Sequence, residues 1–325
     1  MDSDLIKSQA RALAARSFGD KTLKRPLIAS KDLLWLTYLY PLRFLAAILP
    51  PVAVRLTAKI IDPFCQLITW RHKRRLRAEL AQALNRDPSD PEVCRIARRY
   101  ISNAVIRVID DLIMDRLLAD GRQIGVQLRG RENLDRVLAA GRGAIVVSGH
   151  FYAIRLAKRY LAKIGYPMLT VRNQVPSDPA AGRLGRRFLE PRYVNFLHGV
   201  IRDEVFIQDE ECSFKIFKRL QLGGLVNIHF DAPYSQITVR YPFLGTRHTF
   251  SAGFLRIAKL SGSPIIPMLC VGNSEGLSIV FEEPVCLEMT SDKDQFVATN
   301  LPNMVKILET QILEHPDQWE SWIHI

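Results

Sequence analysis

The chain has 325 residues, of which 45 are lysine or arginine and 33 are aspartate or glutamate, so its formal net charge is +12. Charged residues make up 24% of the chain and hydrophobic residues 48%, which excludes a mostly disordered protein, a coiled coil and a collagen-like chain. The length permits one large domain or two smaller ones. The positive charge indicates a negatively charged partner, and its placement along the chain must identify the kind.

Two features bear on the compartment in which the protein works. The five cysteines are scattered and include no CxxC pair, so we expect free thiols in a reducing compartment. Residues 1–30 are polar and lack the compact apolar core of a secretion signal. We therefore expect a polar N-terminal extension here rather than a signal peptide.

Residues 31–78 are predicted to be a helical segment that associates with a membrane. Residues 33–70 are the most apolar part of the chain. Charged residues and prolines interrupt them, so no run reaches the ~18–20 uncharged residues of a spanning helix. A basic cluster, residues 71–77, follows directly, and such a pairing is typical of contact with anionic headgroups. A buried helical pair with a solvated charged end is the alternative.

Strand and helix patterns alternate over residues 79–325. A capping signal at Ser89–Glu92 begins a helix whose apolar positions recur every three or four residues. The expected strands are 126–129, 144–148, 168–171, 225–230, 265–271 and 277–281. The expected helices after the first are 132–140, 152–164, 213–220, 251–260 and 303–314. This alternation predicts an α/β domain with a single central mixed sheet flanked by helices on both faces.

Polar side chains follow three of the predicted strands. His150 comes just after strand 144–148, Arg172 follows the next strand, and Asp231 follows strand 225–230. Ligands of open α/β sheets bind at the carboxyl ends of strands, so these groups converge if the strands are neighbours. Gly149, just before His150, fits either a close approach of the backbone to a substrate oxyanion or a simple turn.

Other kinds of site have little support. His229 and Asp231 stand two positions apart, but no third metal ligand follows at a recognisable spacing. The glycines before His150 lack the spacing of a dinucleotide or P-loop motif, and no nucleic-acid-reading motif is present. We therefore expect no cofactor, no metal and no nucleic-acid partner.

Five segments, in order along the chain, resemble the bacterial lipid A late acyltransferases of the lysophospholipid acyltransferase superfamily. They are GRENLDRVLAAGRGAIVVSGHF, VRNQ, GGLVNIHFDAPY, YPFLGTRHTFSAGFLRIAKLSGSPIIPM and HPDQWESWIHI. The resemblance runs from about Trp70 to the C-terminus and implies the fold of glycerol-phosphate and lysophospholipid acyltransferases. It also implies transfer of a fatty acyl group from an acyl carrier protein or coenzyme A (CoA) thioester to a hydroxyl of an anionic lipid or glycolipid acceptor. The implied location is the cytoplasmic face of the bacterial inner membrane, for a peripheral or monotopic protein.

The superfamily signature is a histidine followed five positions later by an acid, and this chain departs from it. His150 matches the histidine, but Arg155 stands where the acid should be. In the mechanism that the resemblance implies, the histidine takes the proton of the acceptor hydroxyl and the acid orients the imidazole. Arginine has only donors and cannot do this. Asp231 is the leading substitute, and Asp203, Glu204 and Asp209 are further candidates.

Arginines near the site predict anion binding. Arg155 and Arg172 could clamp a phosphate of a headgroup or of a carrier's phosphopantetheine. A solvated helix face shared with Lys158 and Arg159 explains Arg155 equally well.

Phe243 and Gly245 match a family segment near which the resemblance implies a bound acyl chain or headgroup, although Phe243 fits a plain core position as well. The leading hypothesis is a membrane-associated acyltransferase with His150 as general base and Asp231 as orienting acid. A family member without turnover that binds lipid or acyl carrier is one alternative, and an enzyme that hydrolyses the thioester is another.

Overall fold

The computed structural model describes residues 26–119, 124–174, 178–272 and 276–324. Over these residues the chain divides into two compact units, Met1–Pro41 with Pro176–Asn195, and Leu42–Val175 with Phe196–Ile325. The boundaries expected at residues 30 and 78 stay predictions. Residues 1–25, which make up most of the expected polar N-terminal extension, lie outside the described residues.

The smaller unit is built around a buried carboxylate. It contains α2 (Ser30–Thr37), most of the π-helical turn Tyr38–Leu42, the π-helical turn Gly185–Leu189 and the first turns of α9 (Glu190–Ile201). Asp32 is 3% exposed, and its carboxylate accepts the backbone N–H of Gly182 at 2.9 Å. The ring of Trp35 stacks on Tyr193, 5.9 Å between centroids. A hydrogen-bonded acid and an aromatic pair therefore tie the two chain segments of this unit together.

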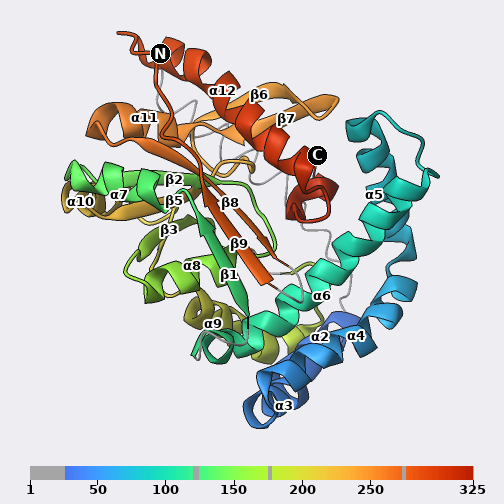
Figure 1. The fold of residues 1–325 in the computed structure, drawn as a ribbon. Helices are drawn as coiled ribbons and strands as arrows, with labels where there is room; N and C mark the ends of the chain where they lie inside the picture. The colour runs from blue at the N-terminus through green and yellow to red at the C-terminus, as the bar shows by residue number, and fades with distance from the viewer. Residues whose placement is uncertain (1–25, 120–123, 175–177, 273–275, 325) are drawn as a thin grey trace. The chain divides into compact units, whose positions relative to one another are not determined.

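The larger unit contains a central mixed sheet, which has seven strands within the described residues (Figure 1). Its strands are β1 (Gly125–Arg129), β2 (Ala144–Ser148), β3 (Met168–Arg172), β4 (Glu204–Phe206), β5 (Leu225–His229), β8 (Ile265–Gly272) and β9 (Gly276–Phe281). The order is β1-β9-β8-β2-β5-β3-β4, and neighbours are parallel except for β8 and β9. The predicted α/β class and mixed sheet are confirmed.

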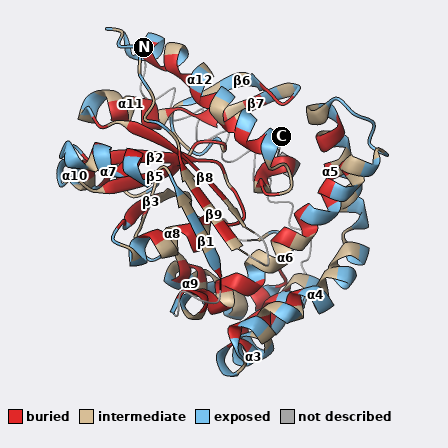
Figure 2. Ribbon diagram, viewed as in Figure 1, coloured by how far each residue is buried: buried red, intermediate tan, exposed pale blue. Residues whose placement is uncertain are grey.

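Helices cover both faces of the sheet, as the buried centre in Figure 2 shows. The covering helices are α7 (Arg131–Ala139), α8 (Ile154–Lys163), α10 (Cys212–Gln221), α11 (Gly253–Ser261) and α12 (Lys293–Glu314). Successive residues of β2 point to opposite faces. Ile145 and Val147 join the core under α10, α11 and α12, whereas Ala144 and Val146 join the core under α7 and α8. This two-sided burial explains why β2 is apolar up to its last residue, Ser148.

A β-hairpin outside the sheet was not predicted from the sequence. Strands β6 (Thr238–Phe243) and β7 (Thr246–Ser251) pair in antiparallel fashion. Their two-residue turn has positive φ at both positions, 48° at Leu244 and 76° at Gly245. This is the type I′ pattern, which matches the twist of the flanking strands and favours glycine. The family-like segment YPFLGTR is therefore the tip of this hairpin.

Four helices precede β1 within the described part of the larger unit. They are α3 (Arg43–Ile48), α4 (Pro51–Ile68), α5 (Trp70–Leu84) and α6 (Pro91–Ala119). Val54 and Ala58 of α4 pack against Ile109 and Ile113 of α6. Among the described residues, no helix combines the length and the apolar character needed to cross a bilayer.

A buried ion pair also joins α4 to α6. The guanidinium of Arg55 binds both carboxylate oxygens of Asp110, at 2.8 and 2.7 Å. Both side chains are largely buried, at 11% and 9% exposed. Removing one partner of such a pair leaves a buried charge and costs about 3–5 kcal/mol. The pair therefore fixes the rotation of α4 on α6, and with it the face of α4 that points outward.

Candidate active site

The ends of β2 and β5 bring two predicted site residues together. The strands pair in parallel, and their last pair sets Ser148 opposite His229. The same offset of 81 positions, continued two residues beyond the strands, places His150 beside Asp231. Both residues lie at the carboxyl edge of these strands, where open α/β sheets bind their ligands.

Asp231 binds His150 through both carboxylate oxygens. Its Oδ1 lies 2.6 Å from the ring Nδ1, and its Oδ2 accepts the backbone N–H of His150 at 2.8 Å. The indole N–H of Trp319 donates to the same Oδ2 at 2.7 Å. The Asp231 side chain is fully buried, whereas 33% of the His150 side chain is exposed. His150 is therefore the member of the pair that a substrate can reach.

This arrangement fixes which nitrogen of His150 can act as a base. An ionised carboxylate only accepts, so Nδ1 carries the hydrogen and the lone pair is on Nε2. Burial opposes the charged form of His150, but the charge of Asp231 and its hydrogen bond outweigh burial and raise the pKa of His150. Burial alone would raise the pKa of Asp231, yet the charge and hydrogen bonds of His150 hold it far below its usual range. The pair has the geometry of a general base with its orienting acid.

The C-terminal segment completes the surroundings of the pair. Trp319 and Phe151 form an isolated antiparallel β-bridge. The backbone N–H of Glu320 donates to the carbonyl of His150 at 2.7 Å. The backbone N–H of Tyr152 donates to the carbonyl of Gln318 at 2.9 Å. Sequence reasoning did not assign a role to Trp319. The one feature of the sequence that could have predicted this role is the tryptophan itself, because a buried indole N–H needs a hydrogen-bond acceptor.

A second imidazole covers the ring of His150. The ring of His229 stacks on it, with 4.5 Å between centroids and 30° between planes. Its Nδ1 lies 3.1 Å from the hydroxyl of Ser148 and 3.3 Å from the carbonyl of Gly149. Burial and the charge of His150 lower the pKa of His229, so this ring is neutral. No sequence pattern predicts this contact, because His229 stands out in the sequence only as a possible metal ligand.

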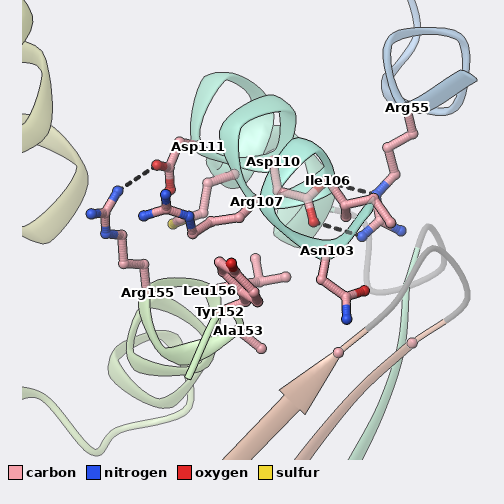
Figure 3. Close-up of a pocket in the computed structure, with 13 residues that line it drawn as sticks. Arg55, Asn103, Ile106, Arg107, Asp110, Asp111, Tyr152, Ala153, Arg155 and Leu156 are labelled. Carbon is pink, nitrogen blue, oxygen red and sulfur yellow. Dashed lines mark hydrogen bonds and ion pairs between the residues drawn. The ribbon is translucent and has the colours of Figure 1, made fainter. Parts of the chain in front are cut away.

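Arg155 binds an acid of α6. Its Nη1 binds Oδ2 of Asp111 at 2.5 Å, beside a cavity of about 30 Å³ (Figure 3). Only 21% of the Arg155 side chain is exposed, and Arg159, 11% exposed, binds Asp115 with two nitrogens. The alternative of a solvated helix face is therefore wrong for these two arginines. Each is held in an ion pair with α6.

Residues 24–325 match the model of a family described as bacterial lipid A biosynthesis acyltransferases. The chain belongs to this family. Among solved structures it is similar to the crystal structure of the 1-acyl-sn-glycerophosphate (LPA) acyltransferase PlsC from Thermotoga maritima. That chain is 14% identical, with a TM-score of 0.38, and the match covers 87% of the present chain and 97% of the other. No curated protein matches the chain.

The other acids considered as substitutes for the signature acid have partners elsewhere. Asp203 binds Arg219 at 2.7 Å, and Glu204 binds Arg172 at 2.5 Å. Asp209 accepts the backbone N–H of Phe206 at 3.3 Å. Of the three polar groups expected at this edge, the structure joins His150 and Asp231 and pairs Arg172 with Glu204. Among the candidate acids in the described residues, Asp231 is the one that hydrogen-bonds to His150.

The two remaining residues predicted to bind substrate have structural contacts of their own. Phe243 is 2% exposed, and its ring meets that of Trp319 at 5.7 Å. Gly245 occupies the left-handed position of the hairpin turn, and its carbonyl accepts from Gln82 at 2.7 Å. Their assignment to substrate binding stays a prediction, as do those of Arg155 and Arg172.

Gly149 occupies a crowded position. A Cβ on this residue would lie 2.8 Å from a methyl carbon of Leu308. The absence of a side chain lets α12 pack directly against the turn that carries His150.

Proposed function

We propose that this protein is an O-acyltransferase that moves a fatty acyl group from an acyl carrier protein or CoA thioester to a hydroxyl of a lipid or glycolipid acceptor. The observation that carries the proposal is the contact of His150 with Asp231 in a chain of the lipid A biosynthesis acyltransferase family. The acyl donor, the acceptor and the membrane location belong to the proposal.

The proposed reaction uses the pair as a base and then as an acid. Nε2 of His150 takes the proton of the acceptor hydroxyl, and the oxygen of that hydroxyl attacks the thioester carbonyl. The charge of Asp231 stabilises the imidazolium that forms. As the tetrahedral intermediate collapses, the new C–O bond is kept, the C–S bond breaks, and the imidazolium returns the proton to the leaving thiolate. The products are the ester and the free thiol.

The difference between the two faces of α4 supports the proposal that the protein binds to a membrane surface. One face packs against α6, and the other exposes large apolar side chains at helical spacing, namely Val52, Leu56, Ile60, Phe64 and Leu67. Exposed Arg71, Arg74 and Arg75 follow at the start of α5. An apolar stripe next to basic residues is the composition of a helix that lies in the plane of an anionic surface. We propose the cytoplasmic face of the inner membrane as this surface.

The smaller unit has the same combination. Leu33, Leu34 and Leu36 of α2 are exposed, as are Phe188 and the neighbouring Arg187. Both units therefore offer apolar and basic groups to lipid. We propose attachment without a spanning helix.

A specific observation favours a second candidate function. Arg155 replaces the signature acid and binds Asp111 instead of the histidine. A family member without turnover, which binds lipid or acyl carrier as an accessory protein, is therefore the alternative.

Incubation of purified protein with acyl carrier protein and CoA thioesters and a panel of lysolipid and glycolipid acceptors distinguishes the two. We expect an acylated acceptor by mass spectrometry and none with His150→Ala. Free fatty acid formed without acceptor would indicate hydrolysis instead. If no acyl product forms and His150→Ala retains full biological function, the accessory role is correct.

A further inference from the structure

A cavity of about 360 Å³ lies along α8, away from the pair of His150 and Asp231. The end of α6, the start of β3 and the loop after α9 form its other walls. This volume is within the range of about 300–1,000 Å³ that is typical of small-molecule sites. Asp115 and Arg202 in its wall are 62% and 63% exposed, so solvent reaches it. The cavity can therefore admit part of a ligand from outside.

The cavity wall carries more positive than negative charge. Its cationic residues in the described part of the chain are Arg155, Lys158, Arg159, Lys163 and Arg202, and its acids are Asp115 and Asp203. Arg159 and Arg202 share Asp115, and Asp203 binds Arg219 from outside the wall. The acids are thus already neutralised.

Lys158 differs from the other cations in its partners. Its Nζ lies 3.3 Å from the hydroxyl of Thr170, and it forms no ion pair with any described residue. Arg155 by contrast binds Asp111, and Lys163 binds the carbonyls of Leu118 and Ala119. Burial, together with the charges of Arg155 and Arg172, lowers the pKa of Lys158 to about 7. An anion beside Nζ would offset this unfavourable environment.

Lys158 also acts on the catalytic pair. Its charge adds to the lowering of the pKa of His229 and partly opposes the rise in the pKa of His150. The electrostatic field of Lys158 therefore extends to the imidazoles, and a substrate whose reacting group is at His150 could place an anionic group in this cavity.

We propose that the cavity binds the phosphate group of a substrate, with Lys158 as its principal ligand and Arg159 lining the same wall. This inference rests on the proposed function. Phosphate is the shared chemistry of two sources, the phosphopantetheine of a carrier protein or CoA and the headgroup of a phospholipid or phosphoglycolipid. A cationic wall with guanidinium and ammonium donors suits this group.

Equilibrium binding of inorganic pyrophosphate to the full chain tests the site without turnover. Lys158→Met keeps the length of the side chain and removes its charge. We expect binding to weaken about tenfold, the loss expected for one charge-assisted hydrogen bond, and Lys158→Arg to retain it. Lys306→Met, at an exposed lysine of α12 outside the cavity, is the matched control and leaves binding unchanged. Equal affinity of wild type and Lys158→Met, or no binding by wild type, overturns the proposal.

Two further pairs of probes identify the source of the phosphate. If the donor occupies the site, Lys158→Met weakens binding of CoA but not of pantetheine. If the acceptor does, it weakens binding of a lysophospholipid with a phosphate monoester but not of the matching monoacylglycerol. No effect on either phosphorylated probe refutes a substrate site. Because these measurements need no reaction, an inactive protein that shows the expected losses contradicts the proposed function and not the phosphate site.

Discussion

Asp231 binds both the imidazole ring and the backbone N–H of His150. One carboxylate oxygen is 2.6 Å from the ring Nδ1, and the other accepts the backbone N–H at 2.8 Å. A carboxylate that hydrogen-bonds to both the ring and the main chain fixes the position of the imidazole as well as its tautomer. We propose that it thereby takes the role that the superfamily signature gives to an acid at the position of Arg155.

Asp231→Asn should abolish most of the activity. The amide has a similar shape but no charge, so the imidazolium loses its stabilising partner and the tautomer is no longer fixed. We expect kcat to fall on the order of 10³–10⁴-fold, by comparison with other histidine–aspartate systems. Asp209→Asn is the matched control, since Asp209 accepts the backbone N–H of Phe206 and an amide oxygen can do the same, so it should change kcat little. Equal effects of the two substitutions would remove Asp231 from the mechanism.

Activity should depend on pH through His150. Only the neutral imidazole accepts a proton, so kcat/KM should fall as the pH drops through the His150 pKa, which is raised above 6.5. By linkage, the protonated ring stabilises the fold below pH 6.5, and this contribution is lost as the pH rises through the folded-state pKa. Asp231→Asn should move the midpoint to lower pH in any residual activity. An unchanged midpoint would show that another group is titrating.

Arg155→Glu restores the signature acid but should not raise turnover. Asp231 already binds the ring, and the new carboxylate would lie beside buried Asp111. We expect the free energy of unfolding to fall by about 3–5 kcal/mol, the cost of breaking a buried pair. Arg155→Gln, which removes the charge without adding another, should be less destabilising in chemical denaturation. A gain in kcat for Arg155→Glu would mean that Asp231 is a poor orienting acid.

Trp319→Phe tests the third hydrogen bond to Asp231. The phenyl ring keeps most of the packing and removes the indole N–H that donates to Oδ2. We expect a loss of about 1.5–3 kcal/mol in stability, the range for a hydrogen bond to a charged group, together with a lower kcat. Trp322→Phe removes an indole N–H that donates to the carbonyl of Pro316 and should leave kcat unchanged. A purely structural role for Trp319 predicts no difference in kcat between the variants.

Ile60→Asp with Phe64→Asp tests the outward face of α4. Both side chains are largely exposed, so the fold should tolerate the change, while the stripe loses its apolar character. We expect binding to vesicles that contain anionic phospholipid to weaken at least about tenfold, since each buried apolar side chain contributes about 1.5–3 kcal/mol. Leu260→Asp, at an exposed leucine of α11, is the control in a co-sedimentation assay. Unchanged binding by the double variant would exclude α4 as the contact.

The sequence was most informative where burial on both sides dictates composition. Most residues of β2 and β5 are apolar and buried, and a histidine or aspartate just beyond each strand stands out. The hairpin escaped prediction although the residues of β6 alternate in burial, because Pro242 within the run argues against a strand. The partners of Arg155 and Trp319 could not be derived, because they depend on how distant segments pack. Asp111 is 44 positions from Arg155, and Trp319 is 88 from Asp231.

The constant offset between β2 and β5 means that insertions in these strands and insertions in the loops between them have different consequences. A single-residue insertion within either strand would shift the register and part His150 from Asp231. The intervening chain, which includes α8, β3, α9, β4 and α10, can change length in its loops without moving either residue. Grafting those loops from relatives should therefore exchange substrate preference while the reaction itself is preserved.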